Sequence, residues 1–181
     1  MGKVLIIVGS RREGNSYILA NKIKEELKKD RIISYIIVPG NQKIHLCTGC
    51  MDCDENGICD FTDDMKRNID RLLECDTIIF ITPTRWNLLS GDIKIFMDRL
   101  NPLYSSKKLK GRKMVSISIS ASAKDVYSGD DAVRSLTNFS ESSGMENVLS
   151  YGFNNCLNFE DILKQQDKIS DLIEKLKVIT K

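Results

Sequence analysis

Short apolar runs alternate with amphipathic segments along this chain. Lys3–Val8 reads KVLIIV, a nearly continuous apolar run typical of a strand buried on both faces of a parallel sheet. Four further runs predict strands at Ser34–Val38, Thr77–Thr82, Lys113–Ser120 and Met145–Tyr151. The pattern predicts a doubly wound α/β fold, with helices on both faces of a five-stranded parallel sheet.

The segments between these runs carry helical periodicity. Two of them repeat apolar residues every three or four positions (Leu19, Ile23 and Leu27; Ile93, Phe96, Met97 and Leu100). From Asn158 onward one apolar stripe predicts a final helix (Phe159, Ile162, Leu163, Ile169, Leu172, Ile173 and Leu176). Thr62, followed by two aspartates, predicts the N-cap of a helix that covers Met65–Leu73.

The charge balance gives no sign of a nucleic-acid or membrane partner. The chain has 27 Lys and Arg against 25 Asp and Glu, a formal net charge of +2, and no long block of one sign. No apolar run approaches the roughly 18 residues that span a bilayer, and the N-terminus is not typical of a signal peptide. We therefore expect residues 1–181 to form a single cytoplasmic domain, in which thiols stay reduced.

The stretch HLCTGCMDCDENGICDF, residues 45–61, holds four of the six cysteines: Cys47, Cys50, Cys53 and Cys59. A reducing compartment disfavours disulfides. The C-x2-C-x2-C-x5-C spacing brings four soft ligands into one short arc, as a [4Fe–4S] cluster requires. Unclustered thiols are the main alternative, and zinc is less favoured because its structural sites usually join two ligand pairs across a longer insert. The two other cysteines are expected to be buried (Cys75 and Cys156).

The loop after the first predicted strand reads GSRREGNS, from Gly9 to Ser16. A glycine-containing turn that feeds a helix presents free backbone N–H groups and the positive end of the helix dipole, which suits a phosphate. Asn15 replaces the lysine of a nucleotide-triphosphate loop, and Arg11 replaces the second glycine of a dinucleotide loop. The residues of this loop therefore favour a binding site for one terminal phosphate, such as that of FMN, over a plain strand-to-helix turn without a ligand.

Three segments jointly resemble one family. GSRREGNS resembles the phosphate loop of the flavodoxin-like NAD(P)H-dependent FMN reductases, and TPTRWNLLSGDIKIFMDR, residues 82–99, resembles their second signature. The cysteine stretch followed by FTDDM is similar to the iron-sulfur flavoprotein branch of that family. The last eighty residues match only in their strand–helix pattern. The resemblance implies a flavodoxin-like sheet of strand order 2-1-3-4-5 that binds FMN.

The resemblance also implies site residues. One set would hold the FMN phosphate (Ser10, Arg11, Arg12, Asn15 and Ser16). A second set would line the isoalloxazine ring and ribityl chain, through backbone N–H groups as much as side chains (Pro83, Thr84, Arg85, Trp86, Asn87 and Leu88). A third follows the fourth strand and would give donors to the flavin rim (Ser120, Ala121 and Ser122). Trp86 is either the apolar wall of the ring or a core or interface aromatic. Asp98 and Arg99 are expected to stabilise their helix or a dimer contact.

The implied function is that of an FMN-binding oxidoreductase. It would accept hydride from NAD(P)H and pass electrons to a quinone, flavin or protein acceptor, through a [4Fe–4S] cluster if the four cysteines hold one. The alternative is an electron-transfer protein that works between ferredoxin-like partners without its own small-molecule substrate. A thiol or metal sensor on this fold is a third hypothesis. Because oligomers are usual in the family, we expect a homodimer or homotetramer.

Overall fold

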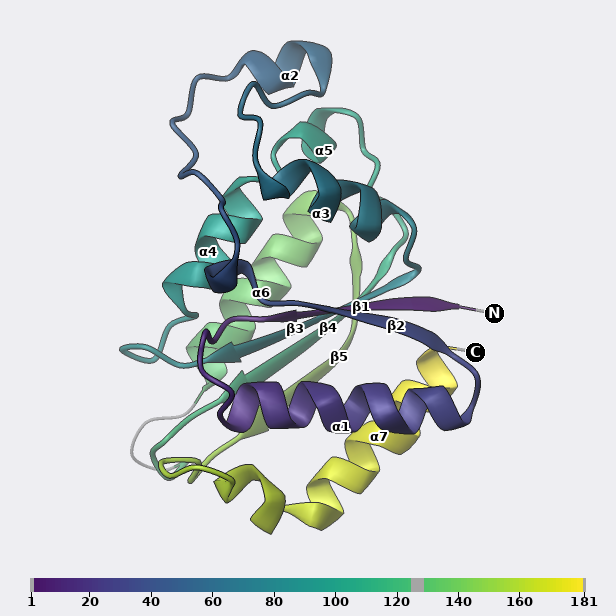
Figure 1. The fold of residues 1–181 in the computed structure, drawn as a ribbon, viewed down its shortest axis with the longest axis vertical. Coiled ribbons are helices and arrows are strands. Elements are labelled where there is room, and N and C mark those ends of the chain that lie inside the picture. The colour runs from purple at the N-terminus through teal and green to yellow at the C-terminus, as the bar shows by residue number, and fades with distance from the viewer. Residues whose placement is uncertain (1, 125–128, 181) are drawn as a thin grey trace.

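A computed structural model describes residues 2–124 and 129–180, and it has the expected sheet (Figure 1). The strands are β1 (Lys3–Val8), β2 (Ile33–Ile37), β3 (Thr77–Pro83), β4 (Lys113–Ile119) and β5 (Glu146–Phe153). All neighbouring strands are parallel, and their order is β2-β1-β3-β4-β5. The predicted strands and the flavodoxin-like order are therefore confirmed, with strand ends shifted by one or two residues.

Helices cover both faces of this sheet (Figure 1). They are α1 (Asn15–Lys29), α2 (Asp52–Asn56), α3 (Asp64–Leu73), α4 (Gly91–Asp98), α5 (Pro102–Ser105), α6 (Asp130–Ser143) and α7 (Gln166–Ile179), with short 3-10 helices η1 (Pro39–Asn41) and η2 (Asp161–Lys164). Helices α1 and α7 cover one face, and α3, α4 and α6 cover the other.

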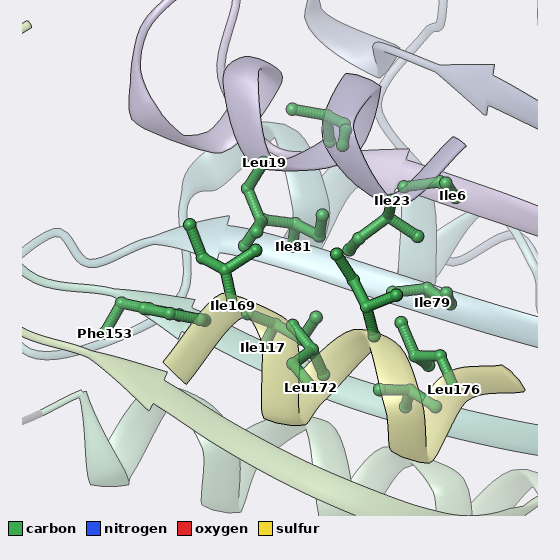
Figure 2. Packing of buried hydrophobic residues seen from close by; sticks show 14 of the residues in the cluster. Ile6, Leu19, Ile23, Ile79, Ile81, Ile117, Phe153, Ile169, Leu172 and Leu176 are labelled. Atoms are coloured by element: carbon green, nitrogen blue, oxygen red, sulfur yellow. The ribbon is translucent and has the colours of Figure 1, made fainter. Parts of the chain in front are cut away.

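Alternation along β1 shows why the sheet is buried on both sides. Ile6 packs with Leu19 of α1 and Leu172 of α7 in one hydrophobic cluster (Figure 2). Its neighbours Leu5 and Ile7 point to the opposite face and join the second cluster. All three β1 side chains are fully buried. The continuous apolar run in the sequence thus fills two cores at once.

Two predicted helix starts are wrong. Asp63, not Thr62, caps α3, because its carboxylate accepts the Met65 N–H at 2.9 Å. The final helix does not begin at Asn158, because Glu160 has a left-handed φ of 64° that a helix cannot continue. The chain instead forms an irregular segment and η2 before α7 begins at Gln166.

The cysteine stretch and the segment after β5 lie at opposite ends of the molecule. The short helix α2 stands at one end of the long axis, beyond α3 and α5, whereas the loop that follows β5 lies at the other (Figure 1). Within the described residues, no helix is long and apolar enough to cross a membrane.

Candidate functional site

A cavity of about 570 Å³ opens at the carboxyl edge of the sheet. Ligands of doubly wound folds bind at this edge, near the point where the strand order reverses. Its lining residues come from the ends of four strands and the loops after them (Ser10, Arg12, Glu13, Gly14, Asn15, Ser16, Pro83, Thr84, Arg85, Ile119, Ala121, Cys156, Leu157, Asn158 and Phe159). Eight of the fourteen residues predicted to bind the cofactor therefore share one cavity, whose size suits a cofactor-sized ligand.

The N-terminus of α1 forms one side of this cavity. Gly14 is the N-cap and offers no side-chain cap, and the first turn contains no acidic residue. Within the part of the chain that the structure describes, the N–H groups of Gly14, Asn15 and Ser16 donate to no protein acceptor. An uncapped helix start that carries free N–H groups attracts an anion. Gly14 itself has open space beside it.

The two arginines predicted to bind the phosphate, Arg11 and Arg12, lie in different places. Arg12 is exposed and lines the cavity, and the Ser10 hydroxyl beside it donates to the Arg12 carbonyl at 3.3 Å. Arg11 lies outside the cavity. Its guanidinium pairs with Asp92 at 3.0 Å, and this hydrogen bond raises the pKa of Arg11. Arg11 lines a neighbouring hollow of about 320 Å³ instead.

The Asn15 side chain is already committed to the protein. Its Nδ2 donates to the carbonyl of Cys156 at 3.1 Å and to that of Asn158 at 2.8 Å. Its Oδ1 accepts the Ile162 N–H at 3.1 Å. Both amide hydrogens are therefore used, so only the backbone N–H of Asn15 is open to a ligand.

The loop after β3 divides into two parts. Pro83, Thr84 and Arg85 line the cavity, although the N–H of Thr84 is bonded to the Ile119 carbonyl at 2.9 Å. Arg85 and Leu88 exchange two backbone hydrogen bonds at 2.8 and 3.0 Å, which closes a tight turn with few donors left for a ligand. Trp86 and Asn87, at the tip, have φ of 51° and 63°, as a hairpin turn of the primed type requires.

The same turn carries Trp86 away from the cavity. The Trp86 side chain is 98% exposed, and neither it, Asn87 nor Leu88 lines the cavity. Within one chain, Trp86 is therefore neither a core aromatic nor a wall of this site.

The residues after β4 mainly form backbone hydrogen bonds with the segment that follows β5. Ala121 lines the cavity, whereas Ser120 and Ser122 do not. The Cys156 N–H donates to the Ser120 carbonyl at 2.9 Å, and the Asn155 N–H donates to the Ser122 carbonyl at 3.0 Å. Residues 125–128, further along the same segment, lie outside the described residues.

The fourth side of the cavity is formed by residues that the sequence does not mark as a site. Leu157, Asn158 and Phe159 follow β5 and line the cavity with Cys156. A signal for them exists, because the rule that ligands sit at the carboxyl ends of parallel strands applies to every strand of the sheet. The apolar stripe from Asn158 hides this signal, because it predicts part of the last helix.

The four clustered cysteines meet at a second, small cavity of about 30 Å³. Cys53 is buried, Cys59 is partly buried, and Cys47 and Cys50 are exposed. The Nδ2 of Asn101 donates to the Cys53 sulfur at 3.2 Å, a contact of the kind that tunes metal-bound thiolates. All six cysteines of the chain are free thiols.

The four thiols around the small cavity are not arranged as a metal site. Within residues 2–124 and 129–180, no group of three or more His, Cys, Asp or Glu side chains is placed to hold a metal ion. A tetrahedral zinc site and a four-cysteine [4Fe–4S] cluster both need such convergence. This cavity shares no lining residue with the larger cavity at the sheet edge, so the cysteines do not border the expected flavin site within one chain.

A buried ion pair closes the base of the cysteine stretch. Arg99 bonds the Asp63 carboxylate at 2.6 and 3.1 Å and also donates to the His45 carbonyl at 2.8 Å. Burial opposes ionisation of Asp63, but hydrogen bonds from Arg99, His45 and Met65 together hold its pKa well below the usual range. Arg99 is 2% exposed, so it is neither a simple helix-end charge nor a surface available for a dimer contact.

The two remaining cysteines are buried, as predicted. Burial raises the pKa of Cys75 to about 11, and the same cause raises the pKa of Cys156 to about 11. The Cys156 sulfur also accepts a hydrogen bond from the Gln165 amide at 3.4 Å. These thiols are packing residues rather than reactive groups.

The family model for NADPH-dependent FMN reductase matches residues 2–156 of the chain. An iron-sulfur flavoprotein of Methanocaldococcus jannaschii is 30% identical over 121 residues, which cover 66% of this chain and 63% of that protein. An iron-sulfur flavoprotein of Archaeoglobus fulgidus is 34% identical over 97 residues, 54% of this chain and 48% of that protein. The chain thus matches between about half and just under two thirds of the length of these relatives.

A solved structure supports the fold. The apo form of an NADH:FMN oxidoreductase superposes with a TM-score of 0.69 and 19% sequence identity, and the match covers 100% of this chain and 91% of that one. At this identity the similarity is one of architecture, and it agrees with the strand order and the two helical layers described above.

Proposed function

Because the chain belongs to the NADPH-dependent FMN reductase family, we propose that it is an FMN-dependent oxidoreductase that takes hydride from NAD(P)H and passes the electrons to an acceptor. The observation that carries the proposal is the cavity of about 570 Å³ at the uncapped start of α1. Bound FMN would supply the hydride-accepting and electron-releasing chemistry. The residues of the chain have the tasks of binding, orientation and charge compensation.

The phosphate end of the cofactor fits the α1 side of the cavity. The free N–H groups of Gly14, Asn15 and Ser16 would donate to the phosphate oxygens. The Arg12 guanidinium lines the same side and would add a positive charge. The Ser10 hydroxyl would add a donor once it turns from the Arg12 carbonyl to the phosphate. Because Asn15 has no free amide hydrogen and Arg11 is paired with Asp92, these two side chains are not needed to hold the phosphate.

The ring would lie against the strand ends. Pro83, Ile119 and Ala121 offer apolar surface, and Arg85 lines the same cavity with an exposed guanidinium. A cation beside the ring compensates negative charge when hydride arrives. Trp86, Asn87 and Leu88 project outward from this site, and we propose that they contact the ring only from a neighbouring subunit.

We propose that Cys47, Cys50, Cys53 and Cys59 are the ligands of a [4Fe–4S] cluster, whose insertion would widen the small cavity between them. Such a cluster supplies one-electron transfer, and the Asn101 amide would donate to one of its thiolate ligands. The names of the two archaeal relatives, both iron-sulfur flavoproteins, support this assignment.

We propose that the chain acts as one FMN-binding domain, in a homodimer or homotetramer in the cytoplasm, with a quinone, flavin or ferredoxin-like acceptor. The separation of the cysteine cavity from the flavin cavity supports an assembly in which the two sites come from different subunits. Two exposed free thiols, Cys47 and Cys50, suit a reducing compartment.

A second candidate is an electron-transfer protein that works between ferredoxin-like partners. The observation that favours it is the exposed apolar surface around the cysteine stretch, where Leu46, Met51 and Ile58 are all more than half exposed. Such a surface suits a protein partner better than a small substrate.

One anaerobic experiment tests the proposal. The purified protein should show flavin absorbance, or acquire it with added FMN, and NADH or NADPH should bleach that absorbance within the catalytic time scale. Iron and sulfide analysis of the same sample tests the cluster. Reduction by ferredoxin alone would favour the second candidate, and absence of flavin binding would remove both.

A further inference from the structure

One side chain ties the phosphate loop to the loop that follows β5. Asn15 begins α1, yet its amide bonds the backbone of three residues more than 140 positions later: the carbonyls of Cys156 and Asn158 and the N–H of Ile162. These three bonds use both amide hydrogens and the amide oxygen. No other side chain of the phosphate loop bonds this segment within the described residues.

The segment fixed in this way presents apolar side chains to the cavity. Leu157 and Phe159 flank Asn158, line the cavity, and are 74% and 68% exposed. Exposed leucine and phenylalanine side chains at the mouth of a ligand cavity leave apolar surface for a bound group to cover. The Asn15 amide bonds the backbone carbonyls on either side of Leu157, those of Cys156 and Asn158. The Asp161 carboxylate accepts the Asn158 N–H at 2.6 Å.

We propose that Asn15 is a positioning residue that holds Leu157 and Phe159 as an apolar wall for the flavin ring. The inference rests on the proposed binding of FMN. Leu157 and Phe159 have no polar side-chain atom, so they have nothing to offer a phosphate, whereas an isoalloxazine ring gains from apolar and aromatic contact. The phosphate is served by the backbone N–H groups at the start of α1.

Comparison of FMN with riboflavin separates the two roles of Asn15, because riboflavin lacks the phosphate. An Asn15→Ala variant removes all three bonds to the β5 loop. If Asn15 positions the ring wall, this variant should weaken FMN and riboflavin by the same factor, about tenfold. If the Asn15 side chain binds the phosphate, only the FMN affinity should fall. A Ser10→Ala variant serves as the phosphate reference, since its loss should be confined to FMN.

A double-mutant cycle gives an independent test that uses FMN alone. Phe159→Ala should weaken FMN about as much as Asn15→Ala, because each removes the same wall. The double variant should then bind no more weakly than the single variants. Fully additive losses would overturn the inference. Phe159 is exposed, so its replacement leaves the fold intact, and Leu157→Ala provides a second exposed variant if Asn15→Ala fails to fold.

The readout is the dissociation constant from flavin fluorescence quenching, with circular dichroism of each variant as the control for folding. Equal losses for the two flavins and a non-additive cycle support the inference. A loss confined to FMN, or unchanged FMN affinity in Phe159→Ala and Leu157→Ala, contradicts it. Failure of the unmodified protein to bind FMN would contradict the proposed function itself, which is a different result.

Discussion

Arg99 holds both carboxylate oxygens of Asp63, at 2.6 and 3.1 Å, in a pair whose side chains are 2% and 1% exposed. Asp63 also caps α3 and accepts the His45 N–H at 2.9 Å. One ion pair therefore joins the end of α4 to both ends of the cysteine stretch. These contacts anchor the stretch at its base.

Replacement of Asp63 should test this anchor. Asp63→Ala leaves the Arg99 guanidinium buried without its partner, which should lower the free energy of unfolding by about 3–5 kcal/mol. Urea unfolding followed by circular dichroism measures the change. The matched control is Asp98→Asn, because Asp98 pairs with Lys94 on the surface and its loss should cost no more than about 1 kcal/mol. Equal effects of the two replacements would contradict the anchoring role.

Acid should weaken the same anchor. The pKa of Asp63 is lowered in the folded protein, so its contribution to stability is complete above its unfolded pKa of roughly 4 and is lost as the pH falls further. The urea midpoint should therefore fall steeply below pH 4. Asp63→Asn should flatten this dependence, and an unchanged slope in that variant would assign the acid sensitivity to other carboxylates.

Four of the six thiols should separate into two classes on alkylation. Cys47 and Cys50 are exposed and should react with iodoacetamide at pH 8 in the metal-free protein, whereas Cys75 and Cys156 are buried with pKa values of about 11 and should resist. Peptide mass spectrometry of partly labelled protein measures the order. Rapid labelling of Cys75 in folded protein would contradict the buried core described here.

Alkaline pH should destabilise the protein through the same two buried thiols. Their folded pKa values are raised, so they favour folding below the unfolded pKa of about 8.5, and this advantage is lost as the pH rises toward 11. The midpoint of urea unfolding should therefore fall between pH 9 and pH 11, and urea titrations at a series of pH values in this range measure the change. A Cys75→Ala variant should show a smaller fall.

Trp86 gives a single intrinsic probe of assembly. It is the only tryptophan of the chain and is 98% exposed in the isolated subunit. Iodide should therefore quench its fluorescence fully in dilute protein, and quenching should weaken with rising concentration if the turn enters a subunit interface. Quenching that is complete at every concentration, with FMN bound, would contradict the proposed role of this turn in a neighbouring subunit.

Much of the architecture was predictable from sequence because it depends on periodicity. The run Lys3–Val8 is apolar throughout, and only a strand with helices on both faces buries such a run completely. The α1 side of the site was also predictable, since Ser10, Arg12 and Ser16 lie in one short loop and the strand before them determines where that loop ends.

The remaining features depend on contacts between distant residues. The place of Asn15 in the loop motif predicts that its side chain binds the phosphate. Only the fold shows that its amide bonds the backbone of residues 156–162 instead. The apolar stripe from Asn158 predicted a helix, but a left-handed Glu160 places Phe159 at the cavity instead. The outward position of Trp86 follows from the turn that Arg85 and Leu88 close, which residue composition alone does not reveal.

If FMN binds with its phosphate at the start of α1, the protein should distinguish FMN from riboflavin. A fluorescence titration of metal-free protein with each flavin in turn measures this difference. We expect saturation at one FMN per chain and an affinity for FMN at least about tenfold higher than for riboflavin, because only FMN has the phosphate that the free N–H groups and Arg12 can hold. Equal affinity for the two flavins, or no quenching by either, would contradict it.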